Sequence, residues 1–253
     1  MMRVLLHGCN GRMGQVITRL ISDMSDVKIV CGVDSNINKA SNNYPVYTSL
    51  SEVKEEVDVL IDFSNHSCIS DILKYGLDKK VPLVICTTGF STEEKQKIID
   101  ASKYIPILNS ANMSLGVNLI ISLVKQAASV LYKDFDIEIV EKHHNQKLDS
   151  PSGTALAIAD AINDSLNNKF EYKYGRYGKT EKRAKNEIGI HAVRGGAIVG
   201  EHDVIFAGGG EIVEISHQAL SRDVFGYGAI RAAQFLIKKQ PGFYSMKDVI
   251  EEE

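Results

Sequence analysis

The chain of 253 residues contains no tryptophan, and aromatic residues of all kinds make up only 7% of it. So few aromatic rings weaken any interpretation that depends on stacking nucleic-acid bases or sugars. A surplus of basic residues is missing as well, because the formal net charge is −3. Proteins that bind nucleic acids usually carry a clustered positive charge. We therefore expect no nucleic-acid partner.

Long hydrophobic runs and paired cysteines are also missing. No stretch reaches the roughly eighteen consecutive apolar residues that a membrane helix needs, and the first apolar run is too short for a signal peptide. No CxxC pair occurs among the four cysteines, which all lie in the first half of the chain: Cys9, Cys31, Cys68 and Cys86. We expect free thiols, a reducing compartment, no contact with a membrane and a cytoplasmic location.

Short apolar runs alternate with amphipathic stretches in the first part of the chain. Such runs, typical of buried parallel strands, occupy residues 4–7, 27–33, 57–63, 81–86 and 105–108. Apolar residues recur at helical spacing from Met13 to Met24, and Ser91 with Glu94 forms a capping box for a helix over 92–103. The alternation predicts an α/β fold with a Rossmann-type, doubly wound parallel sheet.

The pattern changes after about residue 112. A long helix is expected over 115–132, and another begins at Pro151-Ser152-Gly153. Strand-like runs separated by glycine turns follow at 188–194, 198–206 and 212–217. Consecutive hairpins predict an antiparallel meander and hence a second, mixed α/β domain with a largely antiparallel sheet. The last helix, about 224–238, can belong to either domain.

Three glycines, Gly8, Gly11 and Gly14, follow the first strand and open the first helix. This GxxGxxG spacing is a variant of the dinucleotide-binding fingerprint, in the strand–turn–helix context that the fingerprint requires. Glycine permits the tight turn and lets the backbone approach a pyrophosphate at the helix N-terminus. Asp34 ends the second strand, where a carboxylate accepts hydrogen bonds from the adenosine ribose. A glycine turn without a ligand is the alternative.

The residues around Asp34 favour NADH over NADPH. A carboxylate there repels a 2′-phosphate, and Ser35 stands where NADP-binding proteins often carry arginine. Arg12 and Lys39 could compensate in part, so either cofactor stays possible.

Two more segments follow predicted parallel strands: Thr87-Thr88-Gly89 and Ser110-Ala111-Asn112-Met113. Ligands bind at the carboxyl ends of such strands. Because Thr-Gly turns are common in proteins, an ordinary structural turn is an equally good interpretation of each segment.

The segment EKHHNQKLDSPSGTA at residues 141–155 is the richest in reactive side chains. Its helix start offers backbone N–H groups near Gly153 and Thr154, which suit an anion. Lys147 adds a positive charge, and His143 and His144 can donate protons near neutral pH. The segment predicts acid–base chemistry on a carboxylate-bearing substrate, with a polar surface loop as the alternative.

Several other polar residues have plainer interpretations. Glu141 and His143 point the same way on a strand, but no third ligand is near, so we expect no metal. Structural roles are expected for the strand histidines, and ordinary ion pairs for two arginines: His191, His202, His217, Arg194 and Arg222. The basic segment 169–185 is expected to be a solvated loop, or else an electrostatic lure for an anion.

The sequence resembles the dihydrodipicolinate reductase family over essentially its whole length. The motifs that carry the resemblance are GCNGRMG at 8–14, IDFS at 61–64, TTGF at 87–90, ANMSLGVN at 111–118, EKHHNQKLDSPSGTA at 141–155, VRGGAIVGEHDVIF at 193–206, SHQALSRDVFGYGAIRAA at 216–233 and GFYSMKDV at 242–249. The resemblance implies a dinucleotide-binding domain of residues 1–114 plus 223–253. It also implies a substrate-binding and oligomerisation domain of residues 115–222, in a homotetramer.

The resemblance also implies an activity: NAD(P)H-dependent reduction of 4-hydroxy-tetrahydrodipicolinate to tetrahydrodipicolinate, in lysine and diaminopimelate biosynthesis. It implies His143 as proton donor, Lys147 as a second donor or carboxylate partner, and His144, Gly153 and Thr154 as ligands of the cyclic dicarboxylate. The cofactor residues it implies are Gly8, Cys9, Asn10, Gly11, Arg12, Met13, Asp34, Cys86, Thr87, Thr88, Ser110, Ala111, Asn112 and Met113. Met113 departs from the phenylalanine that members often have there.

Two other functions fit parts of the pattern. An acylating semialdehyde dehydrogenase needs a nucleophilic cysteine beside a histidine, whereas no cysteine accompanies His143. A non-catalytic NAD sensor would not need His143 and Lys147, and both are present.

Overall fold

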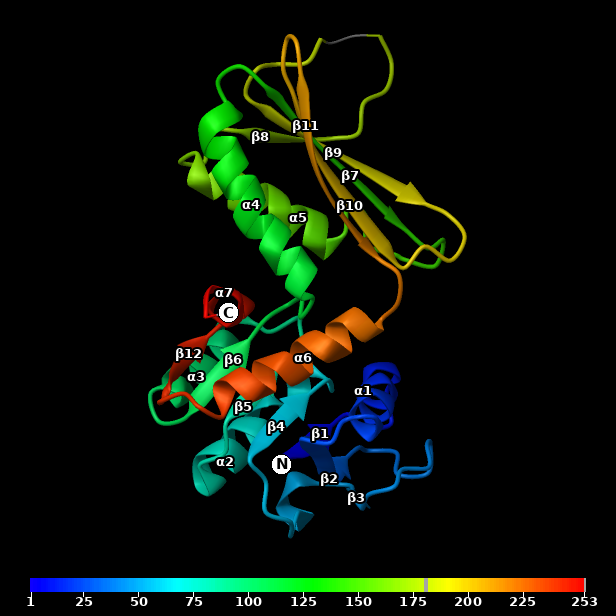
Figure 1. Cartoon of the computed structure of the whole chain (residues 1–253), viewed down its shortest axis with the longest axis vertical. Helices are drawn as coiled ribbons and strands as arrows, with labels where there is room; N and C mark the ends of the chain where they lie inside the picture. Colours follow the sequence, from blue (N-terminus) through cyan, green and yellow to red (C-terminus); the bar gives the residue numbers. More distant parts are fainter. Residues whose placement is uncertain (180–181, 253) are drawn as a thin grey trace. The chain divides into compact units, whose positions relative to one another are not determined.

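The computed structural model describes residues 1–179 and 182–252 (Figure 1). The chain divides into two compact units, which we call unit 1 and unit 2. Unit 1 joins Met1–Leu115 to Arg222–Glu253, and unit 2 is the continuous stretch Gly116–Ser221.

A parallel sheet of seven strands, in the order β12-β6-β5-β4-β1-β2-β3, forms the centre of unit 1. Its strands are β1 (Met2–His7), β2 (Val27–Val33), β3 (Val46–Tyr47), β4 (Val59–Asp62), β5 (Leu83–Ile85), β6 (Pro106–Asn109) and β12 (Gly242–Tyr244). The chain winds outward from β1 in one direction and from β4 in the other. The Rossmann-type prediction is confirmed, and the neighbours β1 and β4 form the switch point at which such sheets bind ligands.

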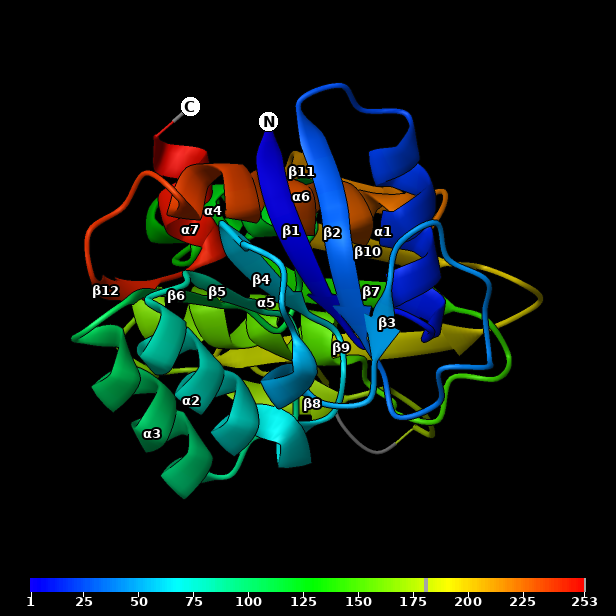
Figure 2. The ribbon, with the colours of Figure 1, turned by 90° about the horizontal axis from the view of Figure 1, so that it is seen from below.

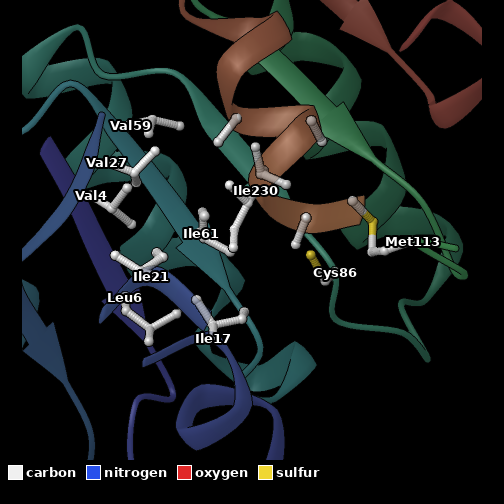
Figure 3. Packing of buried hydrophobic residues seen from close by; sticks show 14 of the residues in the cluster. Val4, Leu6, Ile17, Ile21, Val27, Val59, Ile61, Cys86, Met113 and Ile230 are labelled. Atoms are coloured by element: carbon white, nitrogen blue, oxygen red, sulfur yellow. The ribbon is translucent and has the colours of Figure 1, made fainter. Parts of the chain in front are cut away.

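Helices cover both faces of this sheet (Figure 2). One face carries α1 (Arg12–Ser22), α6 (Asp223–Leu236) and α7 (Met246–Glu251), and the other carries α2 (Ile69–Lys79) and α3 (Thr92–Ser102). Side chains alternate along β1, so Leu6 belongs to one core with Ile17 and Ile230 (Figure 3), while Leu5 belongs with Ile72 to the core on the opposite face. Burial on both faces is why the strands of this sheet are nearly continuous apolar runs.

The helix expected near the C-terminus is α6, and it belongs to unit 1. Two glycines allow it to pack closely there. A Cβ at Gly228 would lie 1.7 Å from the backbone oxygen of Met113, and a Cβ at Gly226 would lie 2.6 Å from a methyl carbon of Leu20.

Unit 2 contains a mixed sheet of five strands in the order β11-β10-β7-β9-β8. Its elements are β7 (Asp136–His143), β8 (Glu171–Tyr174), β9 (Glu187–Arg194), β10 (Gly200–Ala207), β11 (Ile212–Ala219), α4 (Leu115–Leu131) and α5 (Gly153–Ser165). Residues of α4 and α5, among them Val124 and Ile158, form one core with Ile139, Ile190 and Phe206 of the sheet. The predicted mixed α/β second domain is confirmed, but its sheet is not largely antiparallel: β10 pairs antiparallel with β11 and β7, whereas β9 pairs parallel with β7 and β8.

The expected meander is wrong in its first hairpin. The strand β10 pairs antiparallel with β11, as expected, but its other neighbour is β7 and not β9. β7 and β9 are parallel. The turn residues after β9 bond to the end of β7 instead: Gly195 N–H donates to the oxygen of His143, and Asn145 N–H donates to the oxygen of Gly196. Hydrophobic periodicity identifies a strand but not its partner.

Part of the basic segment 169–185 is ordered into the sheet as β8, which pairs parallel with β9. Two of its basic residues are engaged by unit 2 itself. Arg176 and Arg183 both form ion pairs with Glu138, at 3.2 and 2.9 Å. A purely solvated loop is therefore not what the described part of this segment forms.

The four cysteines are free thiols. Among the residues that the structure describes, every helix is too short or too polar to span a bilayer.

Candidate functional site

The glycine turn of unit 1 has the geometry of an anion-binding loop. Gly8 has φ +77°, and a Cβ there would lie 2.7 Å from the backbone oxygen of Phe63. A Cβ on Gly14 would lie 2.3 Å from the oxygen of Gly8, so both positions require glycine. Gly11 is the N-cap of α1, and the first turn of this fully described helix carries no acidic side chain. Its free N–H groups can therefore bind a phosphate.

A cavity of about 350 Å³ lies beside this turn. Its lining includes Gly8, Gly11, Asp34 and Ser35. The two carboxylate oxygens of Asp34 accept hydrogen bonds from the backbone N–H groups of Asn10 (3.0 Å) and Asn36 (2.9 Å), and these bonds fix the carboxylate at the end of β2. A ribose with two free hydroxyl groups fits this lining.

The residues between the glycines face different ways. Cys9 is fully buried in the core, and the Asn10 side chain bonds to the oxygen of Asn36 (2.7 Å) and to Asn42 (2.7 Å). Both side chains are thus engaged by unit 1 itself. Arg12 is exposed and Met13 is half-buried.

A fully buried carboxylate, Asp62, ends β4 at the switch point. Its Oδ1 atom accepts hydrogen bonds from Ser64 N–H (3.1 Å) and Ser64 Oγ (2.6 Å), and it lies 2.8 Å from Nδ1 of His7. Its Oδ2 atom accepts from the Thr87 hydroxyl, at 2.7 Å. Asp62 belongs to the IDFS motif at residues 61–64, but the sequence alone gave this residue no role. An acidic residue ending an otherwise apolar strand was the available signal.

The other predicted cofactor residues follow β5 and β6. Cys86 is buried and Thr88 is exposed. The Ser110 hydroxyl donates to the backbone oxygen of Asn112, at 2.8 Å, next to the exposed Ala111. Met113 is only 2% exposed and belongs to the core beside α6 (Figure 3), so its side chain stabilises the fold.

In unit 2, Glu141 is the buried centre of a hydrogen-bond network on β7. Arg194 binds it through two N–H groups, at 2.8 and 2.7 Å. Nδ1 of His143 lies 2.6 Å from Glu141 Oε2, and the backbone N–H of Ser152 donates to Oε1 at 2.9 Å. Burial would raise the pKa of Glu141, but these hydrogen bonds outweigh burial and hold the pKa below its ordinary value.

The network orients His143. A proton on Nδ1 donates to Glu141, which leaves Nε2 as the nitrogen that can exchange a proton with a ligand. A Cβ on Gly200 of β10 would lie 3.0 Å from Nε2, so glycine keeps that nitrogen unobstructed. Burial, partly offset by Glu141, lowers the pKa of His143 below its ordinary value.

The start of α5 lies next to the same network. The hydroxyl of Ser152, its N-cap, accepts from the backbone N–H of Ala155 at 3.2 Å. Gly153 is exposed, and a Cβ there would meet nothing within 4 Å. Thr154 is half-buried. Because backbone N–H groups at a helix start attract anions, this end of α5 suits a carboxylate.

Lys147 and His144 complete the predicted set in unit 2. Lys147 Nζ lies 2.9 Å from a carboxylate oxygen of Asp149, and three-quarters or more of the lysine side chain is covered. Among the described residues, Nδ1 of His144 and Nε of Arg194 are buried without a hydrogen-bond partner. Such polar atoms are costly unless a ligand or water satisfies them.

His202 was expected to be merely structural, yet it lies directly behind this site. Its Nε2 atom is 3.1 Å from the Ser152 hydroxyl, and its ring meets that of His143 edge to face at 5.3 Å. Burial lowers the pKa of His202 to about 4. Lone histidines on strands are hard to assign from sequence, because their neighbours come from distant strands.

The structure thus gathers the predicted residues into two groups, one in each unit. The ordinary ion pair expected for Arg194 is present, but its partner is the carboxylate that orients His143. In the described part of the chain, no group of three or more His, Cys, Asp or Glu side chains is arranged to hold a metal.

Comparison with known sequences gives full-length matches. Residues 2–113 match the family described as dihydrodipicolinate reductase, N-terminus, and residues 116–250 match dihydrodipicolinate reductase, C-terminus. A 4-hydroxy-tetrahydrodipicolinate reductase from Caldanaerobacter subterraneus subsp. tengcongensis is 60% identical over 250 residues, which cover 99% of this chain and 98% of that protein. The corresponding reductase of Clostridium tetani is 54% identical over 97% of this chain and 96% of its own length.

Solved structures show a similar fold. A dipicolinate-bound dihydrodipicolinate reductase from Paenisporosarcina sp. TG-14 superimposes with a TM-score of 0.83 at 24% identity, covering 98% of this chain and 99% of that one. GenD2 from gentamicin A biosynthesis, in complex with NAD, gives a TM-score of 0.62 at 12% identity, covering 98% and 90%.

Proposed function

Since the chain belongs to the dihydrodipicolinate reductase family, we propose that it reduces 4-hydroxy-tetrahydrodipicolinate to tetrahydrodipicolinate with a nicotinamide cofactor, in lysine and diaminopimelate biosynthesis. The observation that carries the proposal is the buried network around Glu141. It orients His143 beside a helix start suited to a carboxylate, and Lys147 lies in the same unit.

The cofactor is assigned to unit 1. Its residues there are Gly8, Cys9, Asn10, Gly11, Arg12, Met13, Asp34, Cys86, Thr87, Thr88, Ser110, Ala111, Asn112 and Met113. The glycine turn supports this assignment, because the backbone around Gly8 and Gly14 leaves no room for a Cβ atom. The start of α1 can bind a pyrophosphate. When bound, the dihydronicotinamide supplies the hydride.

The substrate is assigned to unit 2. The N–H groups near Gly153 and Thr154 bind one carboxylate of the ring, and Lys147 and His144 bind the charge that remains. Holding the substrate by its two carboxylates fixes the orientation of the ring. The positive groups also stabilise the negative charge that the ring gains during reduction.

His143 supplies the proton that the reduced ring requires. The lowered pKa of His143 makes it a readier proton donor once it is protonated. Glu141 stabilises the protonated form, and Arg194 holds Glu141 ionised, so the three residues act as one unit.

NADH is the cofactor that we favour. The carboxylate of Asp34 is fixed by two backbone N–H groups beside the cavity, where a 2′-phosphate would be repelled. The neighbouring residue is Ser35, which offers no positive charge. NADPH is expected to be the weaker cofactor.

A cytoplasmic homotetramer is the assembly that we propose. Four free cysteines are consistent with a reducing compartment. The family resemblance supports the tetramer, which sedimentation or light scattering will test directly.

Cys9 and Cys86 do not support the chemistry of an acylating dehydrogenase. Burial and the charge of Asp34 raise the pKa of Cys9 to about 12. Burial raises that of Cys86 well above its ordinary value. A thiol must be ionised to act as a nucleophile. The raised pKa of each of these two thiols favours the protonated form.

The test is an absorbance assay of nicotinamide oxidation. The substrate is made in place from pyruvate and aspartate semialdehyde by the preceding synthase, and NADH and NADPH are run side by side. Oxidation that depends on the synthase supports the proposal. If folded protein that binds NADH oxidises neither cofactor, the reductase assignment is wrong.

A further inference from the structure

The side chains around Asp62 have few hydrogen-bond donors, and Asp62 accepts hydrogen bonds from them. This limits which ligand groups they can bind. The carboxylate is 0% exposed and is surrounded by donors. Ser64 donates both its backbone N–H and its hydroxyl proton, while Thr87 donates its hydroxyl proton. A hydroxyl group has one proton and two lone pairs. Because that proton is used in the hydrogen bond to Asp62, the hydroxyl can only accept hydrogen bonds from other groups.

The same reasoning applies to the histidine of the cluster. Nδ1 of His7 lies 2.8 Å from Asp62 Oδ1, an acceptor, so this nitrogen carries the proton. In the neutral ring the other nitrogen, Nε2, is then an acceptor. The carboxylate of Asp62 therefore leaves three side chains as hydrogen-bond acceptors toward other groups. They lie at the ends of three neighbouring strands.

The location of the cluster connects it with a ligand. His7 and Asp62 are register partners at the ends of β1 and β4, the switch point of the sheet. His7 and Ser64 line the cavity that also contains Gly8, Gly11 and Asp34. Thr87 continues the row after β5 and is 8% exposed.

We propose that Asp62 is a positioning residue that fixes Thr87, Ser64 and His7 as hydrogen-bond acceptors toward the dinucleotide. These acceptors select hydroxyl and amide N–H groups of the ligand and reject phosphate oxygens, which also only accept. The inference rests on the proposed assignment of the cofactor to unit 1. It adds a division of that site: phosphates bind to the start of α1, whereas ribose hydroxyls or the carboxamide bind to the acceptor row.

The substitution Asp62→Asn tests the proposal because it reverses the direction of the hydrogen bond between residue 62 and the Thr87 hydroxyl. An amide nitrogen at the place of Oδ2 would donate to the Thr87 hydroxyl, whose own proton would then point toward the ligand. We expect NADH to bind about tenfold more weakly, as for one lost hydrogen bond. The KM for NADH should rise with kcat nearly unchanged, since this contact is uniform through the reaction.

Thr87 variants make the test independent of damage to the core. Thr87→Val removes the acceptor without changing the shape, so it should weaken NADH binding about as much as Asp62→Asn. Thr87→Ser keeps the hydroxyl and should bind NADH as tightly as the unsubstituted protein. Because both substitutions break the same contact, the double variant Asp62→Asn/Thr87→Val should be no worse than either single variant.

Asp58→Asn is the matched control. It makes the same chemical change just before β4, at the opposite end of the strand, where Asp58 pairs with Arg3 at 2.7 Å. NADH affinity should not change in this variant. The measurement is a titration of NADH fluorescence on the full chain, with circular dichroism to verify folding.

Two analogues identify the group that the row recognises. Deamido-NADH carries a carboxylate in place of the carboxamide, and ADP-ribose lacks the nicotinamide ring altogether. If the row accepts from the carboxamide, Thr87→Val weakens NADH but neither analogue. If it accepts from a ribose hydroxyl, all three ligands weaken together. Either pattern supports the proposal.

Two results separate the failure of this inference from the failure of the proposed function. If the unsubstituted protein binds NADH but Asp62→Asn and Thr87→Val bind it equally well, the role of Asp62 is overturned and the reductase assignment stands. If the unsubstituted, folded protein binds neither NADH nor NADPH, the cofactor assignment itself is overturned, and the inference with it.

Discussion

Asp62 in unit 1 and Glu141 in unit 2 are both completely buried carboxylates near the carboxyl end of a strand. They differ in what compensates the charge. Asp62 is bound by a histidine, two hydroxyls and a backbone N–H, with no arginine or lysine among these partners. Glu141 has the guanidinium of Arg194 in a two-point contact. Under our proposals, the first arrangement fixes hydrogen-bond acceptors for a neutral ligand group, and the second holds a histidine ready to transfer a proton.

The largest expected difference between the two regions is catalytic. His143→Asn should lower kcat by about 10²- to 10⁴-fold, the usual contribution of a general acid, without changing NADH affinity. Steady-state kinetics and a fluorescence titration measure the two quantities. His191→Asn is the control, because His191 is also a strand histidine of unit 2 but pairs with Glu138. Equal losses in the two variants would contradict the role of His143.

Removing each charge should separate the regions by stability. Glu141→Gln leaves the largely covered guanidinium of Arg194 without its carboxylate partner and should lower the free energy of unfolding by about 3–5 kcal/mol. Asp62→Asn leaves no arginine without a partner, and it should lower the free energy of unfolding by about 1–3 kcal/mol. Hydrogen exchange at Ile139 of β7 and Leu60 of β4 reports each unit separately. A larger loss at Leu60 than at Ile139 would reverse the comparison.

The pH dependence of stability should differ between the units because of His202. Its pKa is about 4 in the folded protein and near 6.5 when unfolded, so the unfolded chain binds the extra proton first as the pH falls. The stabilisation is complete above about pH 6.5 and is lost on the way down to about pH 4, by about 3 kcal/mol.

Denaturant titrations at pH 7 and pH 4.5 measure this loss for unit 2. His202→Gln should make the stability of unit 2 less dependent on pH, whereas His66→Gln, at an exposed site of unit 1, should change nothing. An unaltered pH dependence in His202→Gln would show that another group is responsible.

The smallest effect is a shift in the pKa of His143. Glu141 raises that pKa and Lys147 lowers it, although burial is the main influence. Glu141→Gln should therefore move the titration of His143 to lower pH, and Lys147→Met should move it to higher pH. NMR of labelled histidine follows the titration without any need for turnover. Shifts in the same direction in both variants would contradict the assigned network.

Local patterns were enough to predict much of this molecule. Apolar runs identified the central strands of unit 1, because both faces of that sheet are buried. Strand alternation predicted that Glu141 and His143 lie on one face, and in the structure His143 Nδ1 lies 2.6 Å from Glu141 Oε2. The glycine spacing predicted the turn before α1.

What could not be predicted depends on residues that are distant in the sequence. One partner of β9 is β7, about fifty residues earlier, and no pattern within β9 encodes that choice. The short edge strands β3 and β12 contain too few residues to show a period. His202 and Arg194 reach the site only because β10 and β9 flank β7. A contact of this kind is set by the sheet and not by the segment.

The return of α6 to unit 1 has a consequence for the order in which the protein folds during synthesis. Unit 2 is continuous in sequence and is completed when residue 221 leaves the ribosome. At that moment the face of the unit 1 sheet that contains Leu6 and Ile61 still lacks Ile230 and its neighbours. The first unit to begin is thus the last to finish, and part of its apolar sheet face stays uncovered until α6 has been synthesised.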